Sequence, residues 1–187
     1  AFALVLTQNT LTIQLSCVGL VLTISYPLMK RWHSLPQVNL GMAFGWAIPM
    51  AYAAVTGHLP LIAWLLFLGN ILWSIVYDTE YAMVDREDDR KIGVKSTAIL
   101  LGQRDKRVIG YLQLVLLGLL IFIGLLAGRS WIYYLSLVIA ACSALYQQYL
   151  IRDRKPDGCF KAFLNNNSFG LTIFCGLLLD YLPMGTA

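Results

Sequence analysis

The hydrophobic and polar positions of this chain alternate on the scale of whole membrane-spanning segments. Apolar runs of about 20 residues, the length that crosses the hydrocarbon core of a bilayer, recur with short polar stretches between them. They cover residues 10–29, 37–56, 60–79, 107–127, 131–150 and 162–182. Residues 1–7 (AFALVLT) are typical of the end of one further span. Because backbone amides in lipid need partners within their own segment, all these runs are predicted to be helices.

Composition supports a bilayer protein. The 187 residues are 58% hydrophobic and 13% charged, whereas a soluble domain contains about 25% charged residues. Residues 1–187 are therefore predicted to form a single all-α domain. We expect a multi-span transmembrane helix bundle, with about six full spans and part of one more. Its partner is the lipid bilayer, and no nucleic-acid partner is expected.

The connections between the apolar runs alternate in charge. Thirteen of the 14 Lys and Arg residues lie on one side, and Arg129 is the exception. The charged connections are KRWHSLPQ, residues 78–107 and RDRKPDGCFK, whereas TGHLP and GRS are nearly uncharged. The positive-inside rule predicts that the charged connections of this multi-pass protein face the cytoplasm.

The acidic residues are concentrated in one segment, YDTEYAMVDREDDRKIGVKS at residues 77–96. No Asp or Glu precedes Asp78, and six of the chain's ten lie between residues 78 and 89. Asp78, Asp85 and Asp89 are spaced i, i+7 and i+11, which places them on one stripe of a helix. Asp88 flanks this stripe, while Glu80 and Glu87 are predicted to point elsewhere.

This acidic stripe is a candidate metal site. Carboxylates at this density repel one another unless a cation lies among them. Oxygen ligands without His or Cys favour a hard cation, and Mg²⁺ commonly uses one or two carboxylates together with substrate phosphates. We therefore predict Mg²⁺ as the cofactor. The candidate metal ligands are Asp85, Asp89 and Asp88, with Asp78 as a further catalytic candidate.

The alternative is a solvated helix end whose carboxylates are neutralised by neighbouring cations such as Arg86. Two features favour a site instead. Asp78 ends an apolar helix, where ionisable groups are costly and usually functional. Basic residues follow immediately, where a Mg²⁺-bridged diphosphate needs further neutralisation. These are Arg90, Lys91 and Lys95.

Other candidate substrate-binding residues lie outside the acidic segment. Lys30 and Arg31 are on the same predicted side of the membrane, with Arg31 suited to a forked phosphate contact and Lys30 to a point charge. An ordinary topology signal is the alternative for this basic pair. Asn70, Trp73 and Tyr77 share one helical face, and Tyr26 and Tyr81 are similar candidates; for all five the alternative is ordinary helix packing. Asn165, Asn166 and Asn167 either cap and join helices or line the pocket.

The run YDTEYAMVDREDDRKIGVKSTAILLG resembles the second aspartate-rich motif of the UbiA-type intramembrane prenyltransferases. Two further segments, YPLMKRWHSLPQVNLGMAFGW and CFKAFLNNNSFG, are similar to the same family. The resemblance implies a helical bundle around a cavity that is open to lipid and capped on the cytoplasmic side. It also implies roles for individual residues. Asp85 and Asp89 would form the D-x-x-x-D metal pair, Asp78 the first acidic position, and Lys30, Arg31 and Lys95 the basic residues near the diphosphate.

The resemblance further implies Mg²⁺-dependent transfer of a polyprenyl group from an allylic polyprenyl diphosphate to the ring of 4-hydroxybenzoate, in ubiquinone biosynthesis at a bacterial inner membrane. A naphthoate, a homogentisate or heme is the alternative acceptor within the family. A transporter or a non-catalytic membrane subunit is the alternative outside it. A transporter usually places ionisable groups near the middle of the membrane, and the spans here are almost free of charge apart from the one that ends at Asp78.

One part of the family pattern is absent from this chain. The family carries a further motif, N-D-x-x-D-x-x-x-D, on an earlier helix, and no Asp or Glu precedes Asp78 here. The chain also begins inside an apolar stretch without an initiator Met. We therefore expect it to be the C-terminal part of a longer protein, with half of the active site and no activity alone.

Overall fold

The chain is helical throughout the part that the computed structural model describes, which comprises residues 2–32, 35–93 and 95–182. No strand occurs among those residues, so the prediction of an all-α fold is confirmed. The helices are α1 (Phe2–Val5), α2 (Thr10–Trp32), α3 (Pro36–Gly45), α4 (Ala47–Thr56), α5 (Leu61–Val84), α6 (Arg86–Ile92), α7 (Thr97–Leu101), the 3-10 turn η1 (Gly102–Arg104), α8 (Asp105–Leu126), α9 (Trp131–Leu150) and α10 (Pro156–Tyr181).

Each of the predicted apolar runs lies in a long helical rod. Four rods in the described part have the length and composition of a membrane span: Pro36–Thr56, Leu61–Val84, Thr97–Leu126 and Pro156–Tyr181. α2 contributes a shorter apolar stretch, Thr10–Tyr26. α9 is long enough to span, but Gln147 and Gln148 near its end make it more polar. The protein is thus an integral membrane helix bundle.

The rod Pro36–Thr56 is divided at Trp46, where α3 gives way to α4. Pro49 has no amide hydrogen to donate to the carbonyl of Gly45, four residues earlier, so the helical ladder loses a bond at this point. The division positions the Trp46 indole, whose Nε1 donates a 2.8 Å hydrogen bond to the carbonyl of Leu15 in α2.

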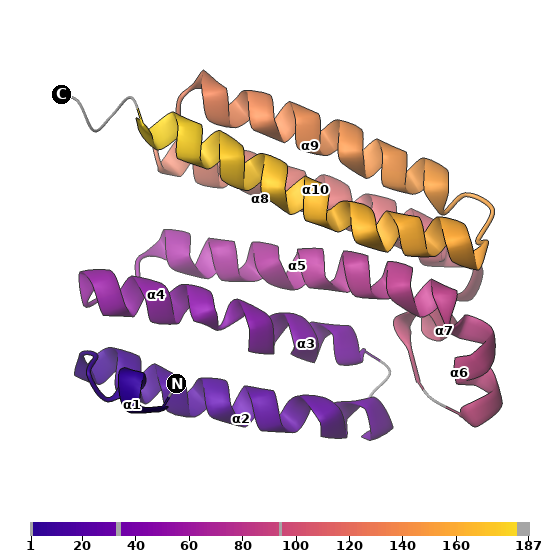
Figure 1. Ribbon diagram of the computed structural model, residues 1–187, viewed down its shortest axis with the longest axis horizontal. Coiled ribbons are helices and arrows are strands. Elements are labelled where there is room, and N and C mark those ends of the chain that lie inside the picture. The colour runs from indigo at the N-terminus through magenta and orange to yellow at the C-terminus, as the bar shows by residue number, and fades with distance from the viewer. Residues whose placement is uncertain (1, 33–34, 94, 183–187) are drawn as a thin grey trace.

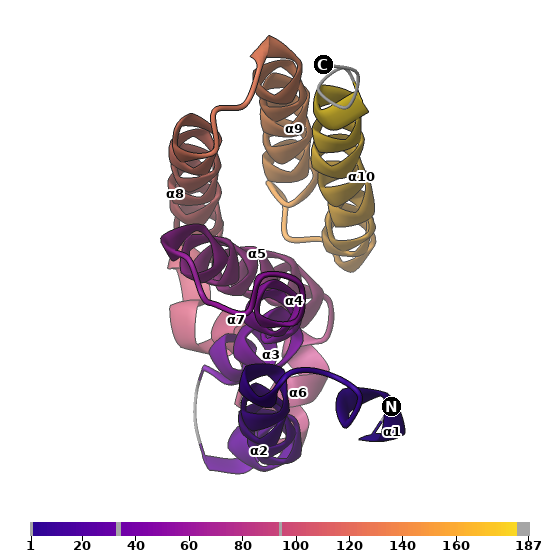
Figure 2. The ribbon, with the colours of Figure 1, turned by 90° about the vertical axis from the view of Figure 1, so that its left-hand side faces the viewer.

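The rods lie side by side, with α5 at the centre (Figures 1 and 2). α8, α9 and α10 lie on one side of α5, and α3, α4 and α2 follow in turn on the other side. The charged α5–α8 and α9–α10 connections and the adjoining ends of α2 and α3 lie at one end of the bundle, on the right in Figure 1. The short connections α4–α5 and α8–α9 lie at the opposite end, which we call the short-loop end. The alternation read from the sequence therefore corresponds to the two ends of one bundle.

Glycines allow the central helices to approach closely. A Cβ added to Gly41 of α3 would lie 2.9 Å from Ile71 Cα and 3.0 Å from Ser74 Cβ of α5. The side-chain amide of Asn70 donates a 3.1 Å hydrogen bond to the carbonyl of Gly41 at the same contact. Small residues and interhelical hydrogen bonds are the usual means by which membrane helices associate, so α3 is held directly against α5.

Arg129, the cation that departs from the charge pattern, pairs with Asp180 at the short-loop end. Its guanidinium lies 3.4 Å from the buried carboxylate of Asp180 in α10 and 4.1 Å from the centre of the Tyr181 ring. The same carboxylate accepts a 3.0 Å hydrogen bond from the amide of Ser130. Because its charge is paired within the protein, Arg129 contributes little to the difference in charge between the two ends.

Candidate active site

The three aspartates of the predicted stripe line one pocket at the charged end of the bundle. The pocket has a volume of about 80 Å³. Its lining comes from the start of α3, the end of α5, α6 and the segment before α7: Pro36, Gln37, Asp78, Tyr81, Ala82, Asp85, Asp89, Lys95 and Ser96. Five of the predicted site residues thus line this pocket: Asp78, Tyr81, Asp85, Asp89 and Lys95.

The aspartates reach this pocket from two helices rather than from one continuous stripe. α5 ends at Val84 and α6 begins at Arg86, with Asp85 (φ −91°, ψ 5°) at the junction. The amide of Asp89 still donates a 2.8 Å hydrogen bond to the carbonyl of Asp85. The expectation of a single uninterrupted helix is therefore wrong in detail, but the local turn keeps Asp85 and Asp89 one turn apart.

A buried hydrogen bond fixes the segment that carries Lys95. The hydroxyl of Thr79 in α5 donates a 3.0 Å bond to the hydroxyl of Thr97, the first residue of α7. Ser96 caps α7 and accepts a 3.4 Å bond from the amide of Ile99. These contacts hold the start of α7 against the end of α5, so Lys95 and Asp78 line the same pocket.

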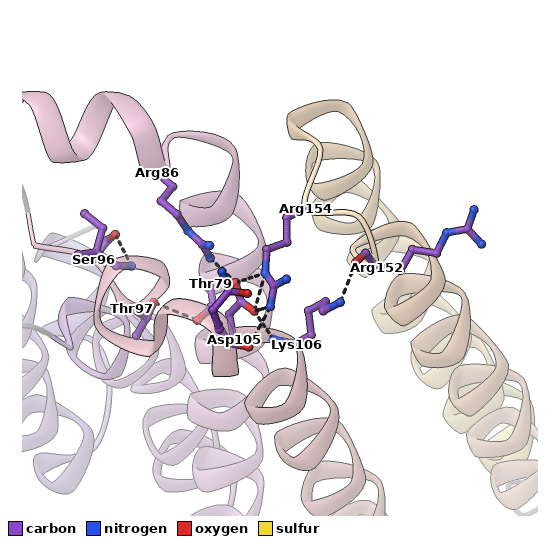
Figure 3. A network of polar contacts seen from close by, with 10 residues as sticks. Thr79, Arg86, Ser96, Thr97, Asp105, Lys106, Arg152 and Arg154 are labelled. Atoms are coloured by element: carbon purple, nitrogen blue, oxygen red, sulfur yellow. Dashed lines mark hydrogen bonds and ion pairs between the residues drawn. The ribbon is translucent and has the colours of Figure 1, made fainter.

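Arg86 does not neutralise the aspartates of the pocket. It forms an ion pair with the fully buried carboxylate of Asp105 at the start of α8 (Figure 3). Arg154, from the α9–α10 connection, pairs with the same carboxylate at 2.8 Å, and the hydrogen bond to Asp105 raises the pKa of Arg154 above its ordinary value. The amide of Lys106 also donates to Asp105 at 2.7 Å. This network joins α6, α8 and the α9–α10 connection, and it leaves neutralisation of the pocket to other cations.

Gln37 is a site residue that the sequence did not single out. It lines the pocket, its exposed fraction is 3%, and its Oε1 is buried without a hydrogen-bond partner in the described structure. A buried carbonyl oxygen without a partner is costly unless a ligand or water completes it. The available signal was its position as the last residue of the charged connection KRWHSLPQ, but glutamine at a helix start has no distinctive pattern.

The remaining predicted residues lie around the pocket or away from it. Asp88 and Lys91 form an exposed pair at 2.9 Å, and the hydrogen bond to Asp88 raises the pKa of the Lys91 ammonium. Tyr26 lies beside a different cavity, between α2 and α3, and Asn70 beside an apolar cavity deeper in the bundle. Lys30 and Arg31 are in the last turns of α2, and their side chains lie outside the described residues.

Aromatic side chains connect the pocket to the interior of the bundle. The ring of Tyr81 lies 5.1 Å from that of Phe163 in α10, which lies 6.3 Å from Tyr77. The rings of Tyr77 and Trp73 are 5.9 Å apart, and those of Trp73 and Phe169 are 6.1 Å apart. We call this series the aromatic ladder. It ends at the apolar cavity of about 160 Å³ that Trp73 and Phe169 help to line.

A buried polar network sets the position of the ladder. The side-chain amide of Asn166 donates a 2.7 Å hydrogen bond to the fully buried carboxyl of Glu80. The indole of Trp73 donates a 2.9 Å bond to Asn166 Oδ1. Asn165 accepts from Ser143 of α9 at 2.6 Å. Asn165 and Asn166 thus act as interhelical contacts, and Glu80 points into the bundle rather than into the acidic pocket.

The donors in the pocket are those that a hard cation prefers. Asp78, Asp85, Asp89 and Gln37 all supply oxygen atoms. Among the described residues, no group of three His, Cys, Asp or Glu side chains is arranged to hold an ion on its own. Carboxylate oxygens of this kind fit the common mode of Mg²⁺ binding, in which one or two carboxylates act together with phosphate oxygens of a substrate.

Comparison with known proteins gives consistent matches over nearly the whole chain. The model of the UbiA prenyltransferase family matches residues 1–172. A 4-hydroxybenzoate octaprenyltransferase of Aeromonas salmonicida is 58% identical over 182 residues, and one of Citrobacter koseri is 57% identical. Each match covers 97% of this chain and 63% of the relative. The chain therefore spans less than two thirds of the length of these curated relatives.

Solved structures show the same fold. The apo structure of a UbiA homolog from Aeropyrum pernix matches with a TM-score of 0.82 at 26% identity, over 97% of this chain and 68% of that one. A structure of digeranylgeranylglyceryl phosphate synthase matches with a TM-score of 0.76 at 16% identity, over 95% of this chain and 64% of that one. At this lower identity the second match supports the fold alone.

Proposed function

Because the chain belongs to the UbiA prenyltransferase family, we propose that the protein is a Mg²⁺-dependent aromatic prenyltransferase. It transfers a polyprenyl group from an allylic polyprenyl diphosphate to the ring of 4-hydroxybenzoate, the acceptor named in the relatives from Aeromonas salmonicida and Citrobacter koseri. The observation that carries the proposal is the pocket in which Asp78, Asp85, Asp89 and Lys95 meet.

The pocket binds the diphosphate end of the donor in this proposal. Asp85 and Asp89 are the metal-binding pair, with Asp78 beside them and Asp88 at the rim. Mg²⁺ bound there supplies positive charge against the developing charge on the leaving diphosphate. The Lys95 ammonium, placed by the Thr79–Thr97 contact, adds charge-assisted hydrogen bonds to phosphate oxygens. Lys30, Arg31 and Lys91 are further cations of this end of the bundle.

The aromatic ladder suits the other end of the donor. An allylic cation is quenched by water, so the reacting carbon needs surroundings from which water is excluded. The rings of Tyr81, Tyr77 and Trp73 lead from the acidic pocket towards an apolar cavity, and aromatic faces stabilise a nearby cation. Asn70 lines the apolar cavity at the end of this path, and Tyr26 lines a separate cavity between α2 and α3. The carbon next to the phenol oxygen of the acceptor attacks the cation, and the ring proton is then lost.

The distribution of charge supports an orientation in the membrane. The acidic pocket lies at the end of the bundle that carries the basic connections. By the positive-inside rule this end faces the cytoplasm, where a water-soluble diphosphate leaving group is released. We propose the bacterial inner membrane as the protein's location, which the similarity to bacterial relatives supports.

The test is polyprenyl transfer onto labelled 4-hydroxybenzoate in membranes of cells that lack their own enzyme. The 187-residue chain is compared with the natural reading frame extended upstream, each with and without Mg²⁺. We expect labelled product only from the extended form and only with Mg²⁺. No product from either form, despite equal membrane insertion, would overturn the proposal. Product with a naphthoate, a homogentisate or heme instead would keep the chemistry and replace the acceptor.

A further inference from the structure

Another cavity, separate from the acidic pocket, lies between α8 and α9. This α8–α9 groove has a volume of about 390 Å³. Its apolar wall includes Leu114 and Leu117 of α8 and Ala141 and Leu145 of α9. It shares no lining residue with the acidic pocket, and α8 and α9 lie on the opposite side of α5 from α3 (Figure 2). The groove therefore needs an explanation of its own.

The end of the groove nearest the charged connections is basic. Lys106 and Arg107 of α8 line it. The Lys106 ammonium reaches across to the α9–α10 connection, where it donates a 2.7 Å hydrogen bond to the carbonyl of Arg152 (Figure 3). An ammonium has three N–H donors, so this bond uses one of them. The guanidinium of Arg107 is on an exposed side chain.

The carboxylates adjacent in sequence to Lys106 and to its contact residue Arg152 are already paired. Asp105 is buried and binds Arg86 and Arg154. Asp153 lies 3.3 Å from the guanidinium of Arg152. Neither carboxylate is therefore available to neutralise Lys106 and Arg107, and the basic end of the groove keeps a positive charge.

We propose that the α8–α9 groove binds an anionic phospholipid. The headgroup phosphate contacts Lys106 and Arg107, and an acyl chain lies along Leu114, Leu117 and Leu145. Gln113 and Gln148 also line the groove, and its leucines lie further along α8 and α9 from the basic end. This matches the order of phosphate, polar backbone and acyl chain in a phospholipid. Basic pockets between membrane helices at this end of a protein are suited to acidic headgroups. A zwitterionic lipid brings its own cation, which would oppose these two.

Native mass spectrometry tests this proposal on the protein expressed from its natural reading frame. Detergent-solubilised protein is titrated with phosphatidylglycerol or phosphatidylcholine, and retained lipid is counted. We expect preferential retention of phosphatidylglycerol, reduced about fivefold for each charge removed in Lys106→Gln and Arg107→Gln. Arg107→Gln is the critical variant, because it leaves the Lys106–Arg152 bond intact. Ala141→Phe places a larger side chain in the apolar part of the groove and leaves the charges unchanged. It should reduce the amount of phosphatidylglycerol retained.

The matched control is the double variant Lys155→Gln, Lys161→Gln. It removes two exposed charges from the same end of the bundle without changing the groove lining. Equal retention of the two lipids would overturn the proposal, as would an equal loss in the control. If Ala141→Phe retains as much phosphatidylglycerol as the unchanged protein, the lipid does not bind in the groove. A protein–protein dimer that Ala141→Phe abolishes would show that a second copy covers the groove instead.

Discussion

Asn166 Nδ2 lies 2.7 Å from Glu80 Oε2 and joins α10 to α5 across 86 positions of sequence. Both side chains are buried, with exposed fractions of 5% and 0%. Since the Asn166 carbonyl oxygen also accepts from the indole of Trp73, one amide satisfies two groups in the centre of the bundle. Asn166 therefore determines how the helix that carries the acidic pocket packs against the last span.

Asn166→Ala is expected to destabilise the bundle. It leaves the Glu80 carboxyl and the Trp73 indole without these partners, at a cost of about 1–3 kcal/mol for each buried group. Asn167→Ala is the matched control, because the neighbouring side chain is exposed. Unfolding in detergent micelles, followed by circular dichroism, measures both. Equal stability of the two variants would show that the network contributes nothing.

Asp85→Asn and Asp89→Asn are each expected to lower turnover of the extended protein at least about a hundredfold, the scale of losing a group that stabilises transition-state charge. Glu87→Gln removes an exposed carboxylate of the same segment and should change turnover by about twofold or less. Prenyl transfer in membranes measures all three. Similar activity of the three variants would contradict the assignment.

Asp88→Asn tests whether the Asp88 carboxylate binds the metal or only pairs with Lys91 at the surface. Its exposed pairing with Lys91 leads us to expect a small loss, close to that of Glu87→Gln, because solvent screens exposed ion pairs and they contribute little. A loss as large as that of Asp89→Asn, together with a raised Mg²⁺ requirement, would place Asp88 among the metal ligands.

Gly41→Ala is expected to separate α3 from α5. The added Cβ would lie 2.9 Å from backbone atom Ile71 Cα, and overpacking of this kind costs about 1–3 kcal/mol. Gln37, one helix turn away on α3, should then shift relative to Asp78, so that turnover falls as well. Gly118→Ala is the control, since a Cβ there meets nothing within 4 Å. Melting temperature and prenyl transfer are compared, and an unchanged Gly41→Ala variant would contradict the close contact.

Asp105→Asn tests the network that joins α6, α8 and the α9–α10 connection. It leaves Arg86 and Arg154 without a carboxylate, and breaking a buried pair costs about 3–5 kcal/mol. Asp153→Asn breaks an exposed pair with Arg152 and should cost about 1 kcal/mol or less. Chemical unfolding in micelles distinguishes the two; a small effect of Asp105→Asn would show that solvent screens this site.

The outline of the bundle could be predicted because its signals are local. Predicted spans 60–79 and 131–150 correspond to α5 (Leu61–Val84) and α9 (Trp131–Leu150), since both depend only on the length and polarity of consecutive residues. The family resemblance found in the acidic segment is confirmed by the match over residues 1–172.

Partners across the bundle could not be predicted in this way. The alternative for the acidic segment was a solvated helix end neutralised by Arg86, Arg90 and Lys91, whereas Arg86 pairs with Asp105, 19 positions away. Arg129 is an exception to the charge pattern in the sequence, and only the structure shows that Asp180 of α10 pairs with it. Gln37 carried no distinctive signal, because its importance comes from the place where α3 meets α5.

The sequence by itself thus determined the helical bundle, the common side of its basic connections and the candidate aspartates. These follow from hydrophobicity, charge and helical spacing, which act between residues near one another in the chain. Only the tertiary structure decided which cations the pocket keeps, where Glu80 points, and how α8 and α9 form a groove with a basic end. Those properties depend on side chains that come together only when distant helices pack, so the free energy of each contact is defined by the fold.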